Sequence, residues 1–168
     1  MAKISRIGFG QVEPNHLSAQ RNGQVYAQLP CASTIKVLEN GQFVKYDYPN
    51  GAVNFTGAGE WMLVMNEVKV YGVAETAKDF ALQADKMDMT PRVLGIQVGD
   101  IFTTNCLEKA GAKGVKTTGA DDIDVETVLK INANGFLDKE GASAEEFTVV
   151  KVYTMPDGQQ GVKVVRTK

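Results

Sequence analysis

Asn-Gly dipeptides constrain the fold of this chain more than any other feature of its sequence. They include Asn22-Gly23, Asn40-Gly41 and Asn134-Gly135. Asn and Gly tolerate the positive φ angles that a tight hairpin turn requires, so the pair is a strong signal for neighbouring antiparallel strands. Because these turns occur in both halves of the chain, we expect a protein built mainly of β-hairpins.

Strands are predicted where β-branched and aromatic residues are enriched and alternate with polar ones. The alternation places Val44, Tyr46 and Tyr48 on one face of a single strand, leaving the charged residues between them on the other. The predicted strands are Val25–Leu29, Thr34–Leu38, Gln42–Tyr48, Trp61–Met65, Val68–Tyr71, Val93–Gln97, Ile101–Thr104, Thr127–Ile131, Gly135–Leu137, Phe147–Met155 and Gly161–Arg166.

One short helix is predicted at Thr76–Ala84, where apolar residues recur at helical spacing and Thr76 can cap the first turn. A polar stretch ending at Pro91 breaks this pattern. The predicted fold class is therefore mostly β, with two small antiparallel β units, barrel-like or sandwich-like, and one short helix between them. Residues 1–20 form an N-terminal arm or an irregular lead-in, residues 21–88 a first β unit ending in the helix, and residues 89–168 a second β unit.

Composition excludes several classes of partner. The 168 residues are 43% hydrophobic, enough for a packed core, and 18 basic and 20 acidic side chains give a net charge of −2. The charges are spread along the chain, so we expect no nucleic-acid partner. No apolar run approaches the roughly 20 residues of a membrane helix, so we expect no membrane partner and a protein made in a cytoplasm.

The residues that usually carry catalysis or metal binding are sparse. His16 is the single histidine, and Cys31 and Cys106 belong to no CxxC pair, which argues against a zinc site or a redox motif. We expect both cysteines to be buried free thiols.

The acidic run at 121–126 is the remaining candidate for metal binding. It lacks the glycine and the terminal glutamate of a calcium-binding EF-hand loop. If this segment is extended, Asp122, Asp124 and Glu126 line one solvated face. We therefore predict a chain that is not an enzyme and that uses no cofactor and no metal.

The segment Trp61–Met65 is apolar at every position, so both of its faces must be covered, either by the core or by a partner. Trp and Met are enriched at interfaces as well as in cores. The possible interface residues are Phe55, Trp61, Met62 and Met65, with a core role as the simpler alternative.

Three segments carry a family resemblance: the opening Met1-Ala2-Lys3-Ile4, the motif Gly59-Glu60-Trp61-Met62-Leu63-Val64-Met65-Asn66-Glu67-Val68, and Val98-Gly99-Asp100-Ile101-Phe102-Thr103-Thr104-Asn105. Together they resemble small virion structural proteins of tailed bacteriophages, in particular capsid decoration or cement proteins. The resemblance implies a β-rich protein on the capsid surface of the virion that reinforces contacts between major capsid subunits. The implied partners are the major capsid protein and other copies of the same chain.

Other functions remain open at this point. A tail, head-fibre or head–tail joining component belongs to the same class. A small carbohydrate-binding or ligand-binding β module is the alternative from a different class, with Tyr46, Tyr48 and Trp61 as its aromatic candidates. An enzyme would have to depend on residues such as Asp122 or Asp124.

Overall fold

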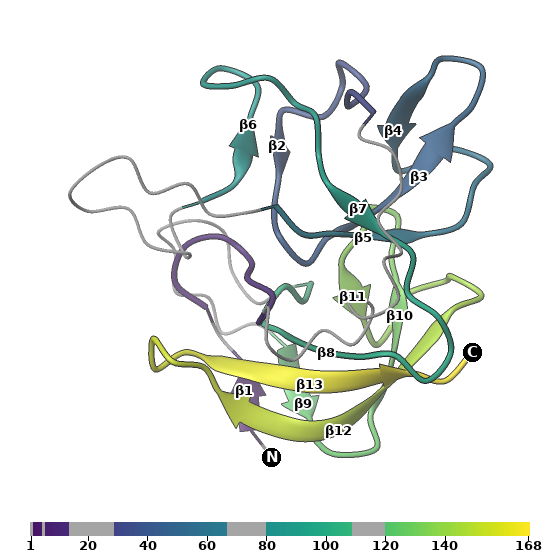
Figure 1. Ribbon diagram of the computed structural model, residues 1–168. Coiled ribbons are helices and arrows are strands. Elements are labelled where there is room, and N and C mark those ends of the chain that lie inside the picture. The colour runs from purple at the N-terminus through teal and green to yellow at the C-terminus, as the bar shows by residue number, and fades with distance from the viewer. Residues whose placement is uncertain (1, 5, 14–28, 67–79, 109–119) are drawn as a thin grey trace.

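The computed structural model describes residues 2–4, 6–13, 29–66, 80–108 and 120–168 (Figure 1). All regular secondary structure in these ranges is β-strand, and every sheet is antiparallel, as the turn and strand patterns predicted. The described part of the chain contains no helix with the length and apolar character needed to cross a membrane.

The strands form two larger sheets and two short pairs. The four-stranded sheet has the order β4-β3-β5-β7, the five-stranded sheet has the order β11-β10-β12-β13-β8, and β1 pairs with β9 and β2 with β6. The strands are β1 (Ala2–Ile4), β2 (Val37–Leu38), β3 (Phe43–Asp47), β4 (Ala52–Asn54), β5 (Met62–Val64), β6 (Leu82–Gln83), β7 (Val93–Leu94), β8 (Ile101–Thr104), β9 (Ala120–Ile123), β10 (Val128–Ile131), β11 (Leu137–Asp138), β12 (Glu146–Thr154) and β13 (Gln160–Arg166).

Three Asn-Gly pairs lie in the described ranges, and all form turns with a positive φ at the glycine, +96° at Gly41, +57° at Gly51 and +79° at Gly135. The turns at Gly51 and Gly135 join paired strands, β3 with β4 and β10 with β11. The turn at Gly41 instead leads from β2, which pairs with β6, into β3, which pairs with β4 and β5. The pair Asn22-Gly23 lies outside the described residues.

The short helix predicted at Thr76–Ala84 is not seen in the described part of this segment. Leu82 and Gln83 form β6, in which Leu82 faces Leu38 of β2 across an antiparallel pair, and Ala81 is buried. Residues 76–79 lie outside the described ranges. At the described end of the segment, Leu82 pairs with the fully buried Leu38, so residues 82 and 83 are extended there.

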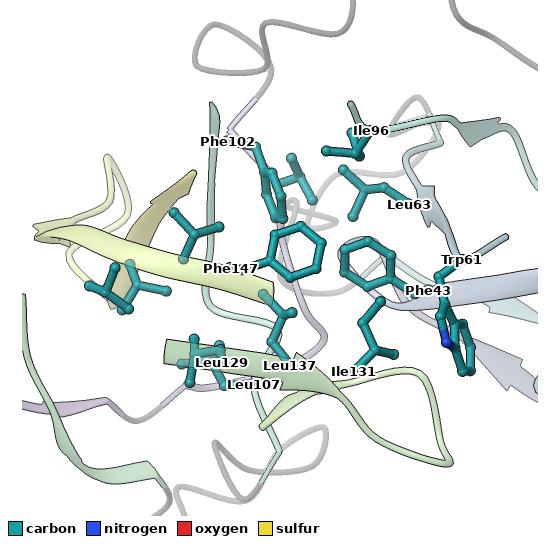
Figure 2. Close-up of a cluster of buried hydrophobic side chains, with 14 of the residues drawn as sticks. Phe43, Trp61, Leu63, Ile96, Phe102, Leu107, Leu129, Ile131, Leu137 and Phe147 are labelled. Carbon is teal, nitrogen blue, oxygen red and sulfur yellow. The ribbon is translucent and has the colours of Figure 1, made fainter. Parts of the chain in front are cut away.

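Three phenylalanine rings join the two larger sheets (Figure 2). Phe43 comes from β3, and its ring centroid lies 6.2 Å from that of Phe102 on β8 and 5.3 Å from that of Phe147 on β12. The rings of Phe102 and Phe147 are 5.9 Å apart and meet edge to face, a favourable aromatic geometry. One hydrophobic cluster therefore contains residues from both sides of the boundary predicted between the two β units, at 88/89.

A second buried cluster lies on the other side of the four-stranded sheet. Val44 and Met62 contribute to it, and Tyr46 packs against it, so the predicted shared face of Val44 and Tyr46 is confirmed. Its members are Ile35, Leu38, Val44, Val53, Met62, Val64, Leu82 and Val93. Strand β7 continues the sheet across the predicted boundary, since Leu94 pairs with Leu63.

Short irregular segments cover three edge strands. Along β4, the N–H of Val53 donates to Pro30 and the N–H of Ala32 donates to Val53. Along β8, Glu13 donates to Thr103 and the neighbouring Val12 bridges Thr104, while along β11 Glu108 donates to Leu137. Covered edges do not offer free backbone groups to another chain.

The turn at Gly41 gives a test of close packing. Gly41 and Gly99 have nearly the same φ, +96° and +93°, but a Cβ on Gly41 would lie 2.5 Å from Cys106 Cβ, whereas a Cβ on Gly99 would meet nothing within 4 Å. A positive φ costs a non-glycine residue about 1–2 kcal/mol, and overpacking adds about 1–3 kcal/mol. We expect Gly41→Ala to lower the free energy of unfolding in urea by more than Gly99→Ala does. Equal losses would show that the contact with Cys106 relaxes freely.

Candidate functional site

The outward face of the five-stranded sheet carries an exposed row of side chains that runs across four strands. In register, Val128 on β10 faces Thr148 on β12, Thr148 faces Val165 on β13, and Val165 faces Ile101 on β8. The residue beside each of these along its strand is buried in the core, so alternation turns the row outward. We call Val128, Thr148, Val165 and Ile101 the apolar row.

The apolar row is accessible in the single chain. Val128 is 44% exposed and Ile101 is 36% exposed, while Thr148 and Val165 are half-buried. A β-bulge extends the exposed apolar area, because the register passes from Val149 paired with Val164 to Lys151 paired with Lys163 and leaves Val150 as the extra residue. Val150 is exposed as well.

Lysines flank the apolar row on both sides. On one side, Lys151 and Lys163 are direct cross-strand partners. On the other side, Glu146 lies between two further lysines, with its Oε1 3.3 Å from Lys130 Nζ and 3.7 Å from Lys168 Nζ. No basic face was predicted, because the charges are spread along the sequence, and only the strand register brings Lys151 opposite Lys163 and Lys130 opposite Glu146.

The four residues predicted as a possible interface lie elsewhere. Trp61 is 8% exposed and belongs to the hydrophobic cluster that contains the three phenylalanine rings. Met62 belongs to the second buried cluster. Phe55 and Met65 are half-buried and pack against these clusters. The Lys45 Nζ lies over the Trp61 ring, 4.9 Å from its centroid. This burial within one chain favours the core alternative for the segment 61–65.

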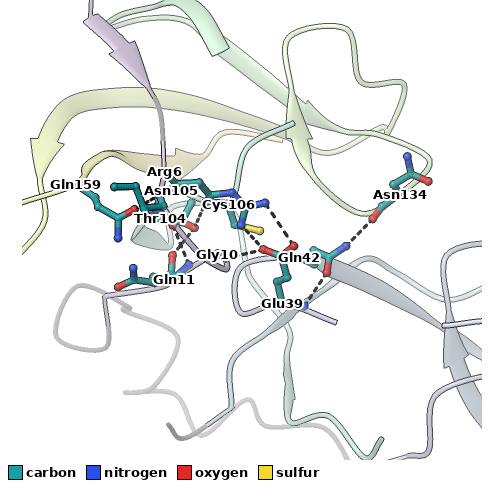
Figure 3. A network of polar contacts seen from close by, with 11 residues as sticks. Arg6, Gly10, Gln11, Glu39, Gln42, Thr104, Asn105, Cys106, Asn134 and Gln159 are labelled. Carbon is teal, nitrogen blue, oxygen red and sulfur yellow. Dashed lines mark hydrogen bonds and ion pairs between the residues drawn. The ribbon is translucent and has the colours of Figure 1, made fainter. Parts of the chain in front are cut away.

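A buried polar junction fixes the N-terminal segment to the rest of the chain (Figure 3). Arg6 and Glu39 form an ion pair that is shielded from solvent. Glu39 also accepts a hydrogen bond from the Gly10 N–H at 2.6 Å, and its own N–H donates to Gln42 Oε1 at 2.7 Å. The carboxylate of Glu39 is therefore held by donors from the N-terminal segment.

Further hydrogen bonds attach the same segment to the end of β8 and to the β12–β13 turn. Gln11 donates its N–H to Asn105 Oδ1 at 2.8 Å, and its carbonyl accepts from Thr104 Oγ1 at 2.6 Å. The Ile7 N–H donates to Gln159 Oε1. Residues 6–13 thus pack on their own chain, which favours the lead-in alternative over an extended arm for this stretch.

Neither cysteine has the environment of a reactive thiol. Cys106 is fully buried beside the polar junction, and this burial raises the pKa of its thiol. Cys31 is half-buried, and burial raises the pKa of its thiol to about 11. Both side chains therefore stay protonated at neutral pH and are poor nucleophiles.

The acidic run at 121–126 does not continue as one extended face. Strand β9 ends at Ile123, and Glu126 has a positive φ of 71°. A turn forms instead, in which the Asp124 N–H donates to Thr127 Oγ1 at 3.0 Å. Across the described ranges, no group of three or more His, Cys, Asp or Glu side chains is placed to hold a metal ion. His16 lies outside these ranges.

A comparison of the chain with protein-family models, curated proteins and solved structures finds no match.

Replacing Trp61 separates a core role from an interface role. If the side chain is core, Trp61→Ala should lower the free energy of unfolding of the isolated chain by about 3–5 kcal/mol. The matched control is Tyr48→Ala, because Tyr48 is 68% exposed and such surface changes stay within about 0.5 kcal/mol. Urea denaturation measures both values. A Trp61→Ala chain as stable as the Tyr48→Ala chain would reverse the assignment to the core.

The buried ion pair gives a second stability test. Glu39→Gln leaves the Arg6 guanidinium buried without its carboxylate, so we expect a loss of about 3–5 kcal/mol in the free energy of unfolding. The control Glu146→Gln breaks an exposed pair with Lys130 and should cost at most about 1 kcal/mol. The double variant Arg6→Met with Glu39→Gln should be more stable than Glu39→Gln alone. The expectation fails if Glu39→Gln and Glu146→Gln are equally mild.

Proposed function

We propose that this chain is a non-enzymatic virion structural protein that binds the outside of a phage capsid and reinforces contacts between major capsid subunits. The observation that carries the proposal is the apolar row on the outward face of the five-stranded sheet. Cores of protein interfaces combine such exposed apolar side chains with a polar rim, and the row and its flanking lysines have this arrangement.

The resemblance that suggested this function rests on segments that form the framework rather than the surface. The motif at 59–68 contains β5, and the motif at 98–105 contains β8. Leu63 of β5 and Phe102 of β8 both belong to the cluster that joins the sheets. Of the residues in these two motifs, Ile101 is the one that belongs to the apolar row.

Sheet-face docking suits this fold better than pairing through a strand edge. The edges of β4, β8 and β11 are covered by segments of the same chain. A partner that added a strand there would have to displace these backbone hydrogen bonds. Docking through the face leaves them intact, and many copies on a repeating lattice give strong overall attachment from individually modest contacts.

The alternative of a carbohydrate-binding or ligand-binding module depends on exposed aromatic rings. Tyr48 is exposed, and its ring centroid lies 5.9 Å from that of Tyr46. Trp61, the third aromatic candidate, is buried. Two of the three aromatic candidates remain at the surface, and we rank this function second. A tail, head-fibre or head–tail joining role would use the same kind of face and is distinguished by where the protein binds.

Sedimentation with phage heads tests the proposal. The purified chain is mixed with heads of its phage that lack it, and we expect it to co-pellet at a saturable ratio and to raise the temperature at which the heads open. Heads that already carry a full complement of the protein are the matched control and should take up no more. If heads that lack the protein do not bind it, the proposal is contradicted, and a tail component or a free ligand-binding module is favoured.

A further inference from the structure

We infer that the apolar row and the flanking Lys151–Lys163 pair form one docking surface for an acidic protein surface, in which carboxylates surround exposed aliphatic side chains. The inference deepens the proposed function and rests on it for the identity of the partner, which would be a major capsid subunit. The contact itself is argued from the charges and the register of the sheet.

The Lys151–Lys163 pair is the first observation. Like charges placed directly opposite each other on antiparallel strands destabilise the pair. Lys151 and Lys163 face each other in this way, and within the described ranges no carboxylate forms an ion pair with either ammonium group. The Lys151 Nζ lies 5.9 Å from the Tyr153 ring, which orients it without neutralising its charge. Carboxylates of a partner would relieve this repulsion.

The contrast with the other flank is the second observation. Lys130 and Lys168 share the carboxylate of Glu146, so that side of the apolar row is already partly neutralised. The turn that precedes β10 bonds to Val149, so Asp124 and Glu126 lie at the Val150 end of the face, the end that also carries Lys151. Among the described residues, neither carboxylate forms an ion pair with Lys151 or Lys163, and both ammonium groups lie beside the exposed Val150 without such a partner.

A second copy of the same face complements the Lys151–Lys163 pair poorly. A two-fold contact between two identical faces places the same patch on both sides of the interface. If the two-fold axis crosses the apolar row, Lys151 and Lys163 of one copy meet the same lysines of the other, and like-charge contacts across an interface are costly. If the axis runs along the row, they meet the other flank, where the Glu146 carboxylate is already shared by Lys130 and Lys168. A partner surface with several free carboxylates complements this face better than a second copy does.

The apolar row favours a protein over nucleic acid as the occupant. Phosphate backbones are bound by arrays of Lys and Arg with polar side chains, and this binding needs no aliphatic centre. Here the lysines flank a row that contains Val128, Val165 and Ile101. Aliphatic side chains in the middle and charges at the rim match the anatomy of a protein–protein interface.

Charge reversal tests the inference on phage heads. The variant Lys151→Glu with Lys163→Glu should bind heads at least 10-fold more weakly than the unchanged chain. Its matched control is Lys36→Glu with Lys86→Glu, which makes the same change in net charge at exposed lysines near β2 and β6. The control should bind within about twofold of the unchanged chain at 0.15 M salt, where charges beyond about 8 Å are screened.

The apolar contribution is tested by Val128→Thr, with Val37→Thr as its control, since these two strand valines are 44% and 42% exposed. We expect weaker binding for the first variant and unchanged binding for the second. Thermal unfolding of all variants checks that each is folded. If heads bind the unchanged chain and the Lys151/Lys163 variant equally well, the inference is wrong while the proposed function stands.

A defined probe tests the surface without any phage head. The ¹⁵N-labelled full chain is titrated with a peptide of alternating Glu and Val, and separately with a peptide of alternating Lys and Val. We expect amide shifts at Val128, Lys163 and Val165 with the first peptide and not with the second. Equal shifts with both peptides, or larger shifts with a duplex DNA of 20 base pairs, would overturn the inference. Selective binding of the Glu–Val peptide together with no binding to heads would overturn the proposed function alone.

Discussion

The contact among Phe43, Phe102 and Phe147 is the interaction on which the rest of the structure depends. It packs β3 of one sheet against β8 and β12 of the other, so two sheets that share no ladder hydrogen bonds enclose one core. The same packing sets the outer surface. Because Phe102 and Phe147 point inward, their strand neighbours Ile101 and Thr148 must point outward, and the apolar row is the external counterpart of the aromatic core.

Local sequence patterns predicted much of the fold, and non-local pairing decided the rest. Ile101–Thr104 was predicted with the bounds that β8 has, and the hairpin of β12 and β13 was predicted within one residue at each end, because alternation and turn residues are local signals. In the segment 76–84 the described residues Leu82 and Gln83 are extended, because Leu82 pairs with Leu38 far away in sequence. Strands β1 and β9 were missed, since three or four residues offer too little alternation. Strand β4 was missed although the turn at Asn50-Gly51 joins it to β3.

The candidate site was harder to predict than the fold. Trp61 and its methionine neighbours were predicted as possible interface residues, because large apolar residues occur both in cores and at interfaces. Only the folded chain shows that Trp61 is 8% exposed. The Lys151–Lys163 pair carries no motif. A bulge at Val150 shifts the register by one residue and brings the two lysines opposite each other. The position of this bulge is not predicted by the sequence pattern.

The buried polar junction also determines when this protein can complete its fold during synthesis. The Ile7 N–H donates to Gln159, which lies 152 positions later in the chain. At about 5–20 residues per second, that partner is made roughly 8–30 s afterwards. The hydrogen bond that attaches residue 7 to the β12–β13 turn therefore cannot form until that interval has passed.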